Sequence, residues 1–417
     1  MKHFLVVNLF FIFFVSFGSS MYLRFDGTLT SDVLNSWSYK GDEAALFLNS
    51  YNIKVIDSGA FSNFKNLKSL FLYDNDLSEI EANAFLGLNN LTELYLWNNK
   101  IEKIDENAFS NLVNLKYLYL NGNQINQLEL GTFKNTKNLE ALNLSKNNLS
   151  NKIDSMVFEK LKNLKKLYLS DNHIETVDED IHAHLENLET LDLSKNKIEN
   201  VTPKNFQQLK KLEYLFLYGN KIETIEENTF SGLNNLTMLS LEDNLISDID
   251  ERAFEDLINL KILTLYNNQI TEIEPYLFSK LKNLIELDLD NNRISKIEPD
   301  YFSNLKVLKR LYLSGNKISA IHSNVFLDLI YLQQLYIDDN QVSFIYKSEF
   351  DHLEDLEILS LKNNQIAFLN PNIFQYLEYL DYLCLAGNPI PQDFQFNLEN
   401  LDYLFEELIW SEMCGTD

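Results

Sequence analysis

Cysteine is rare in this chain. Its 417 residues include two cysteines, Cys384 and Cys414. At most one internal disulfide can therefore form, even in an oxidising compartment. The stability of the fold must come mainly from the packing of apolar side chains.

Long hydrophobic runs are also scarce, with a single example at the N-terminus. Lys2 provides a positive charge, residues 4–17 form an apolar run, and residues 18–20 are small, as at a signal-peptidase cleavage site. The run is shorter than the roughly 20 residues that span a bilayer, which favours a signal peptide over a membrane-anchoring helix. Because no second run and no hydrophobic C-terminal tail follow, we expect a signal peptide at 1–20 and a soluble protein, secreted to the extracellular space without membrane insertion.

Basic residues are few relative to acidic ones. Lysine and arginine number 35 against 61 aspartate and glutamate residues, which gives a formal net charge of -26. Such a charge repels phosphate backbones and anionic lipid surfaces, and the sequence lacks the basic stripe expected of a nucleic-acid-binding protein. We therefore expect no nucleic-acid partner, and a neutral or basic protein ligand is favoured.

Catalytic and metal-binding patterns are missing as well. No serine or cysteine nucleophile is paired with a histidine, and no glycine-rich phosphate-binding loop occurs. His182 and His184 lie near Asp178 and Asp180, but two imidazoles at this spacing form no closed set of metal ligands. The sequence predicts a protein that is not an enzyme and that has no metal or cofactor.

One repeat covers most of the chain. Aligning "LTELYLWNNKIEKIDENAFSNLVN" with its neighbours gives the 24-residue pattern L-x-x-L-x-L-x-x-N-x-I-x-x-I-x-x-x-x-F-x-x-L-x-x. The asparagines of this pattern are Asn75, Asn99, Asn123, Asn147, Asn172, Asn196, Asn220, Asn244, Asn268, Asn292, Asn316, Asn340, Asn364 and Asn388. Every step is 24 residues except the step from Asn147 to Asn172, which is 25. With an incomplete first unit, in which Tyr51 replaces the asparagine, the chain has about fifteen units.

Two residue types recur as ladders. An inward-facing asparagine amide has donors and an acceptor that can satisfy loop backbone groups, so we expect a structural role for these asparagines. A ladder of phenylalanines is interrupted at His182, where Ile181 is expected to take the place. Since one unit cannot bury enough apolar surface to fold alone, the units must stack into a solenoid.

This pattern resembles the leucine-rich repeat family, and specifically its extracellular class with 24-residue units. The resemblance covers residues 44–392 and implies an α/β fold, a curved right-handed solenoid of about fifteen units in which one short parallel strand per unit lines the concave side of a horseshoe. Within the family, the long solenoid, the signal peptide and the scarce cysteines are similar to the secreted leucine-rich immune proteins of insects and to Toll-like receptor ectodomains.

A solenoid exposes apolar core at both ends and needs caps. At the front, residues 21–43 are predicted to form an N-terminal cap, with a hairpin around Asp26-Gly27 and with Trp37 covering the first unit. At the back, residues 393–417 show apolar residues at helical spacing and are predicted to form a helical C-terminal cap.

Aromatic residues dominate the predicted concave face of the first units. Side chains alternate along a strand, so residues that flank the second and third leucines of each unit point outward. The outward aromatics of four successive strands are Phe47, Phe71, Tyr73, Tyr95, Trp97, Tyr117 and Tyr119. They could cover one another on the sheet, stack on a glycan, or bind a protein, and the last reading is preferred because a contiguous exposed aromatic patch is costly in a secreted monomer.

Other candidate sites are more dispersed. A secondary concave set comprises Tyr214, Phe216, Tyr218, Glu286, Asp288, Asp290 and Arg310, whose carboxylates could bind a cation or basic partner or be solvated surface. Cys384 and Cys414 could bridge within the chain or link two chains. Sequons for N-glycosylation occur at Asn90, Asn143, Asn148, Asn200 and Asn235, and a glycan on Asn143 would limit a concave ligand to one side.

The preferred hypothesis is a secreted recognition scaffold that binds a protein through its concave face, in innate immunity. One alternative is an extracellular-matrix or cell-adhesion protein, whose partner could be a second copy of the chain. Another is the non-catalytic regulatory subunit of a secreted enzyme complex. The immune role is inferred by analogy at the level of the fold.

Overall fold

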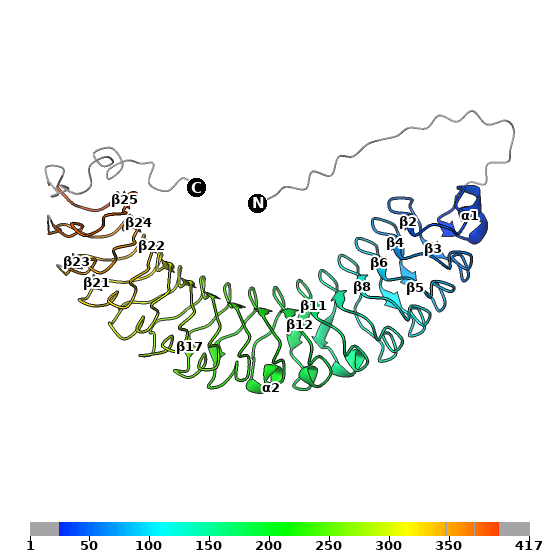
Figure 1. The fold of residues 1–417 in the computed structure, drawn as a ribbon, viewed down its shortest axis with the longest axis horizontal. Coiled ribbons are helices and arrows are strands. Elements are labelled where there is room, and N and C mark those ends of the chain that lie inside the picture. Colours follow the sequence, from blue (N-terminus) through cyan, green and yellow to red (C-terminus); the bar gives the residue numbers. More distant parts are fainter. Residues whose placement is uncertain (1–24, 347, 371, 392–417) are drawn as a thin grey trace, which may run out of the picture.

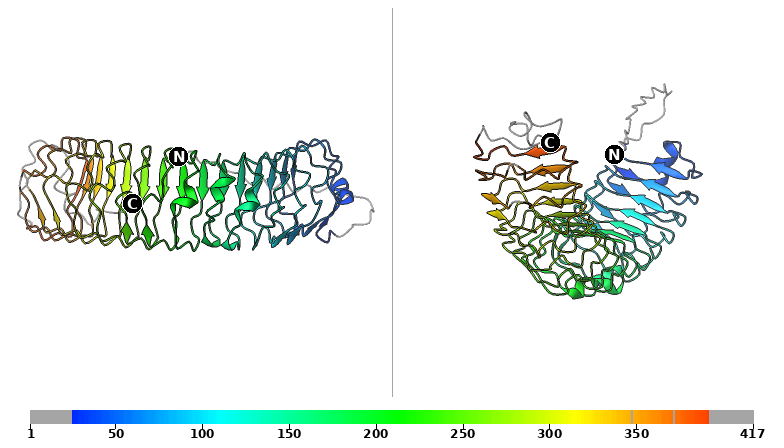
Figure 2. Two further views of the ribbon diagram at one scale, coloured as in Figure 1. Left: turned by 90° about the horizontal axis from the view of Figure 1, so that it is seen from below. Right: turned by 60° about the vertical axis from the view of Figure 1, so that its left-hand side comes forward.

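The chain forms an open arc of stacked units (Figure 1). A computed structural model describes residues 25–346, 348–370 and 372–391. The predicted signal peptide at 1–20 and the predicted C-terminal cap at 393–417 lie outside the described residues. Each unit contributes one strand to the inner side of the arc and a loop to its outer side, as the two further views in Figure 2 also show.

The inner side is a single parallel sheet of fifteen strands. In chain order these are β2 (Ala45–Phe47), β4 (Ser69–Phe71), β6 (Glu93–Tyr95), β8 (Tyr117–Tyr119), β9 (Ala141–Asn143), β11 (Lys166–Tyr168), β13 (Thr190–Asp192), β14 (Tyr214–Phe216), β16 (Met238–Ser240), β18 (Ile262–Thr264), β19 (Glu286–Asp288), β20 (Arg310–Tyr312), β22 (Gln334–Tyr336), β24 (Ile358–Ser360) and β25 (Tyr382–Cys384). Equivalent leucines are paired throughout, for example Leu94 with Leu118. The predicted solenoid of about fifteen parallel-strand units is therefore confirmed.

The outer side carries short strand pairs and very little helix. The parallel pairs are β1 (Thr28–Leu29) with β3 (Val55–Ile56), β5 (Glu79–Ile80) with β7 (Lys103–Ile104), β10 (Ser150–Lys152) with β12 (His173–Thr176), β15 (Thr224–Ile225) with β17 (Asp248–Ile249), and β21 (Ala320–Ile321) with β23 (Phe344–Ile345). The helices of the described residues are α1 (Ser31–Ser36), α2 (Pro203–Phe206) and the 3-10 turns η1 (Ser155–Phe158) and η2 (Ile181–Ala183).

The conserved spacing of asparagine creates an internal hydrogen-bond ladder, as the sequence predicted. Asn99 is typical: its Nδ2 donates to the carbonyl oxygens of Leu72 (3.0 Å) and Leu96 (3.1 Å), and its Oδ1 accepts from the backbone N–H of Leu77 (3.1 Å). These amides are almost fully buried, apart from the half-buried Asn388 at the end of the ladder, and each joins two successive units. They satisfy loop backbone groups that have no strand partner.

The residue before each ladder asparagine has a left-handed backbone. Its φ ranges from 51° at Lys195 to 75° at Gly387. Glycine, asparagine and aspartate tolerate this conformation best, which explains why dipeptides such as Asn-Asn, Asp-Asn and Gly-Asn recur at this point of the unit. Lys146 (φ 55°) and Lys195 are the exceptions, and their backbones are strained because a lysine Cβ atom disfavours positive φ.

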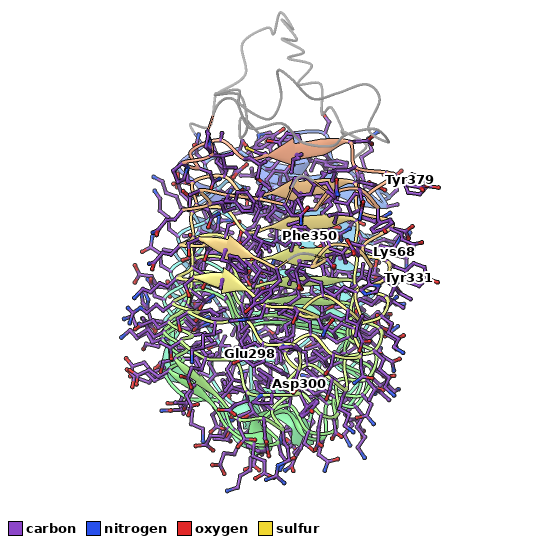
Figure 3. All side chains as sticks on the ribbon, turned by 90° about the vertical axis from the view of Figure 1, so that its left-hand side faces the viewer. Lys68, Glu298, Asp300, Tyr331, Phe350 and Tyr379 are labelled. Atoms are coloured by element: carbon purple, nitrogen blue, oxygen red, sulfur yellow. The ribbon has the colours of Figure 1, made fainter. Side chains whose placement is uncertain are left out.

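Phenylalanine forms the second ladder, on the outer side of the core. Its members are Phe61, Phe85, Phe109, Phe133, Phe158, Phe206, Phe230, Phe254, Phe278, Phe302, Phe326, Phe350 and Phe374, all at most 2% exposed. Most neighbouring rings stack with centroids 6.0–6.4 Å apart. Phe350, one member of this ladder, is labelled in Figure 3. Ile181 is 4% exposed and replaces the missing ring, as predicted.

The N-terminal cap is described from Phe25 onward, so the first strand of the predicted hairpin, at residues 22–24, lies outside the described residues. Thr28–Leu29, which follow Asp26-Gly27, pair in parallel with Val55–Ile56 of the first unit. The chain then enters α1, whose first turn is capped by the Thr30 hydroxyl. Trp37 does cover the first unit as predicted, since its ring contacts Phe25 and Tyr51 at 5.1 and 4.9 Å.

Candidate functional site

The predicted aromatic patch exists as two adjacent ring stacks on β2, β4, β6 and β8. In the first stack, Phe47, Phe71, Tyr95 and Tyr119 lie nearly parallel, with successive centroids 4.5, 4.5 and 5.2 Å apart. In the second, Tyr73 stacks on Trp97 at 4.4 Å. Edge-to-face contacts join the stacks, as between the rings of Tyr95 and Trp97 at 5.3 Å. The register of the parallel strands aligns equivalent positions and produces this arrangement.

The seventh predicted member, Tyr117, lies outside the two stacks. Strand pairing places it beside Glu93 in a third column of the sheet. Glu93 accepts hydrogen bonds through Oε2 from the hydroxyls of Tyr95 (2.9 Å) and Ser69 (3.0 Å). Burial and the bond to Glu93 raise the pKa of Tyr95, so this hydroxyl remains a protonated donor at physiological pH.

Stacking determines which parts of the rings a ligand can reach. The ring faces contact one another, so the patch presents mainly ring edges, and all members except Phe47 are half-buried. Phe47, at the outer end, is 55% exposed. Each stacked pair contributes about 0.5–1.5 kcal/mol beyond the area that it buries. The patch therefore also stabilises the fold. The ring faces on which a sugar would stack are largely covered by neighbouring rings.

The secondary aromatic set comes from a single unit around β14. Tyr214 is exposed, and Phe216 and Tyr218 are half-buried. Phe216 pairs across the sheet with Asp192 on one side and Ser240 on the other, so no ring stack extends from it. These three residues therefore form a small local surface, separate from the larger patch.

The acidic residues of β19 lie together on the concave face. Arg310 is paired with Glu286, whose Oε2 is 2.8 Å from Nε and 2.6 Å from Nη2. Burial raises the pKa of Asp288 to about 6 and that of Asp290 to about 7, and the carboxylate of Asp288 adds to the shift at Asp290. Near neutral pH these two carboxyls are partly protonated.

Two further carboxylates belong to this acidic region and were missed by the sequence analysis. Glu242 accepts from the Ser240 hydroxyl (2.6 Å) and also from Thr264, and its charge raises the pKa of Asp288. Asp338 raises the pKa of Asp290. Glu242 and Asp338 lie in the same column of the repeat as Asp290, two units before and two units after it, so writing the units beneath one another would have revealed them.

The described residues show neither a metal centre nor a membrane-spanning helix. No group of three or more histidine, cysteine, aspartate or glutamate side chains in ranges 25–346, 348–370 and 372–391 could hold a metal ion. In the same ranges, no helix has the length and apolar character needed to cross a bilayer. Chemically, the concave face offers aromatic edges at one end and desolvated carboxyls at the other.

The remaining predicted sites differ in their surroundings. Cys384 lies at a concave strand position, where an outward side chain was expected, but it is fully buried and disulfide-bonded. Cys414, the other cysteine of the sequence, lies outside the described residues. Asn143 is half-exposed on β9, directly after Tyr119 in the sheet. The other sequon asparagines, Asn90, Asn148, Asn200 and Asn235, are exposed.

Comparison with solved structures shows the same fold in several organisms. A leucine-rich repeat protein of Leptospira interrogans is 29% identical, with a TM-score of 0.72 over 86% of this chain and 94% of its own. The TLR13–ssRNA13 complex is 28% identical (TM-score 0.64, 84% of this chain and 51% of that chain). The Drosophila Toll–Spatzle complex is 22% identical (TM-score 0.73, 92% and 52%). The chain thus spans about half the length of these two receptor chains.

A family model provides the assignment. No curated protein matches the chain. The model described as "Leucine rich repeat" matches residues 44–101, 89–149, 147–198, 186–246, 234–294, 282–342 and 330–390, which together cover most of the sequence. Fifteen parallel strands with paired leucines, an internal asparagine ladder and this match lead to one conclusion: the chain belongs to the leucine-rich repeat family.

Proposed function

We propose that this chain is a secreted, non-enzymatic recognition scaffold that binds a protein partner through the aromatic patch on its concave face. The observation that carries the proposal is the clustering of six rings into two joined stacks on the first strands of the sheet. Aromatic residues are enriched among the residues that dominate protein-protein binding energy. A rigid sheet holds them in place, which lowers the entropy lost on binding.

The geometry favours protein over glycan as the ligand. Because the ring faces stack on one another, a sugar would find few open faces, whereas apolar side chains of a protein can pack against the exposed edges and against Phe47. The net charge of -26 favours a neutral or basic partner. A glycan on Asn143 would border the patch and restrict the ligand to the units before β9.

Innate immunity is the proposed setting. The structures with this fold include the Toll–Spatzle complex and TLR13, and the former is described as a hub in Drosophila development and innate immunity. This chain shares the solenoid with these structures, and its own residues form the concave patch. The setting therefore rests on analogy with the fold, and the binding patch rests on the residues of this chain.

Affinity capture tests the proposal. The secreted chain is immobilised and exposed to the extracellular fluid from which it comes, in parallel with a double variant, Tyr95→Ala with Trp97→Ala. We expect a protein that is retained by the parent chain, identified by mass spectrometry, and lost from the variant. Equal capture by both chains would contradict a role of the patch in binding.

A matched control separates binding from folding. Tyr312 and Tyr336 form another stacked pair on the concave face, with centroids 5.2 Å apart. Replacing both by alanine removes a similar stack from a different place. This control variant should retain the captured protein, and circular dichroism should show that both variants keep the strand content of the parent.

A further inference from the structure

One flank of the solenoid carries a second asparagine ladder, which the sequence analysis missed. These asparagines precede the first leucine of their units, and each Nδ2 donates to a backbone carbonyl of the preceding unit, at 2.7–3.0 Å. The members are Asn90, Asn114, Asn138, Asn163, Asn187, Asn235, Asn259 and Asn283. Apart from Asn187, whose Oδ1 accepts from Lys211, their Oδ1 atoms accept no hydrogen bond within the described residues.

An open groove of about 740 Å³ follows the first five asparagines of this flank ladder, from Asn90 to Asn187. It runs from Lys68 to Lys211 and is lined only by asparagine, threonine, lysine and glutamate side chains. Figure 3 views the arc along its long axis and shows Lys68 projecting from this flank, the same side from which Tyr331 and Tyr379 project further along the chain. The groove is therefore a lateral surface, distinct from the concave patch.

Lysines outnumber carboxylates along the groove. Lys68, Lys116, Lys165 and Lys211 line it, against Glu140 and Glu189. Further exposed lysines belong to the residues whose backbone carbonyls accept the ladder bonds, namely Lys65, Lys137, Lys162 and Lys210. A chain of net charge -26 thus has a basic stripe on one flank. The expectation that no basic stripe exists is wrong, because lysines about 48 residues apart in sequence come together only in the stacked fold.

The stripe acts locally in spite of the net charge. At physiological ionic strength, interactions between exposed charges are largely screened beyond about 8 Å. The acidic region of the concave face is on another surface of the solenoid, so its repulsion reaches the groove weakly. Glu140 pairs with Lys116 at 2.8 Å and Glu189 approaches Lys165 at 4.0 Å, yet both lysines stay about half exposed.

The lining indicates the class of ligand. The groove contains no aromatic and no aliphatic side chain, so it lacks both the apolar centre of a protein interface and the stacking platforms of a single-stranded nucleic-acid site. It does offer lysine donors for anionic groups and a row of free amide oxygens for hydroxyl donors. Among polymers that carry both anionic groups and hydroxyls, an acidic polysaccharide is the one that needs no aromatic stacking platform.

The spacing of the lysines also fits such a polymer. From Lys68 to Lys116 and from Lys116 to Lys165 the step is two units, or roughly 10 Å at the usual separation of neighbouring strands. This is close to the length of one disaccharide of an acidic polysaccharide. A linear chain could therefore place one anionic group near each lysine along the groove.

We propose that the lateral groove between Lys68 and Lys211 binds an anionic polysaccharide through its lysines and the flank ladder of asparagines. This surface is separate from the aromatic patch, so the inference does not depend on the proposed function. A partner protein on the concave face and a polysaccharide on the flank could be bound at once.

Binding of heparin oligosaccharides, used as the probe, tests the proposal. The variant replaces Lys68, Lys116, Lys165 and Lys211 by glutamate. Each lysine near an anionic surface contributes about 1 kcal/mol, so we expect the parent chain to bind heparin at physiological salt and the variant, which lacks four lysines, to bind on the order of 1000-fold more weakly. All proteins are compared after enzymatic removal of N-glycans, because Asn90 lines the same groove.

A matched variant controls for net charge. Lys100, Lys103, Lys197 and Lys221 are exposed and lie outside the groove, and two of them are ion-paired, as two are in the groove set. Replacing these four by glutamate changes the net charge equally and should leave heparin affinity within about threefold of the parent. Circular dichroism confirms that both variants are folded.

Several results would overturn the proposal. It fails if the parent chain does not bind heparin at physiological salt, or if the control set lowers affinity as much as the groove set. It also fails if poly-glutamate or single-stranded oligo-dT binds the parent as tightly as heparin does, because the amide oxygens would then have no role in selecting hydroxyls. Tighter binding of heparin than of either polymer, lost only with the groove variant, would support it.

Discussion

At the scale of single residues, the two asparagine ladders show how burial changes the contribution of one side chain to the stability of the fold. Asn99 lies in the core and satisfies three backbone groups, whereas Asn114 lies on the flank and makes one bond, to the carbonyl oxygen of Asn89 (2.8 Å). Leaving a buried backbone group unpaired costs about 1–3 kcal/mol, while an exposed group can bond to water instead.

The ladders should therefore respond very differently to alanine. Asn99→Ala leaves the buried N–H of Leu77 without a partner, while the carbonyls of Leu72 and Leu96 keep one bond each, from Asn75 and Asn123. We therefore expect the free energy of unfolding to fall by about 1–3 kcal/mol. Asn114→Ala should cost about 0.5–1 kcal/mol. Urea unfolding followed by circular dichroism measures both values. Equal losses would mean that the inner ladder is not satisfying buried groups.

The acidic region makes stability depend on pH. The pKa of Asp290 is raised to about 7 by burial, so the folded state favours its protonated form. Stability from this residue is fully present below the unfolded pKa, near 4, and is lost as pH rises through about 7.

Asp290→Asn mimics the protonated carboxyl at every pH. We expect this variant to be more stable than the parent by roughly 2 kcal/mol at pH 8 and to be within about 1 kcal/mol of it at pH 4.5. Thermal unfolding at the two pH values gives the comparison, with Asp300→Asn as a control on the exposed surface. A stabilisation of the same size at both pH values would show that burial of charge is not its cause.

At the scale of elements, the turn after each strand is set by one residue with positive φ. Lys146 occupies this position with φ 55°, where the preceding unit has Gly122 with φ 69°. A side chain other than glycine, asparagine or aspartate pays roughly 1–2 kcal/mol in the left-handed region. Glycine in turn gives the unfolded chain more freedom, which offsets part of this difference.

Lys146→Gly should consequently stabilise the protein by about 0.5–1 kcal/mol. The midpoint of thermal unfolding provides the measurement. Asn98→Gly at the equivalent turn is the comparison and should gain less, because asparagine already tolerates the left-handed conformation. A lower midpoint for Lys146→Gly would contradict this explanation of the turn.

Elements also show what sequence reasoning can and cannot predict. The period of leucine and asparagine predicted every concave strand, because alternation and stacking leave one register that buries the leucines. Alternation around Asp26-Gly27 indicates a strand but does not identify the strand with which it pairs. Val55–Ile56 of the first unit offered an open strand edge, and Thr28–Leu29 paired there in parallel.

At the scale of the whole molecule, surface properties arise from columns of residues that are far apart in sequence. The aromatic patch was predicted because its rings lie at the outward positions of four successive strands. The basic stripe was missed because three of its lysines, Lys68, Lys116 and Lys165, alternate with threonine and glutamate along one column. The flank ladder occupies one position of successive units, but its meaning depends on the flank that it shares with these lysines. The stacking of ring faces and the burial of Asp288 and Asp290 depend on three-dimensional packing. The period of the sequence does not reveal this packing.

The central claim is that the concave aromatic patch binds a protein partner. Its most direct test is the dissociation constant of the captured partner for three purified chains: the parent, the Tyr95→Ala and Trp97→Ala double variant, and the Tyr312→Ala and Tyr336→Ala control. Two aromatic residues at the centre of an interface contribute about 2 kcal/mol or more each, so we predict at least a 100-fold weaker affinity for the patch variant and less than threefold change for the control. The same affinity for all three chains would contradict the claim and show that the rings serve the fold alone.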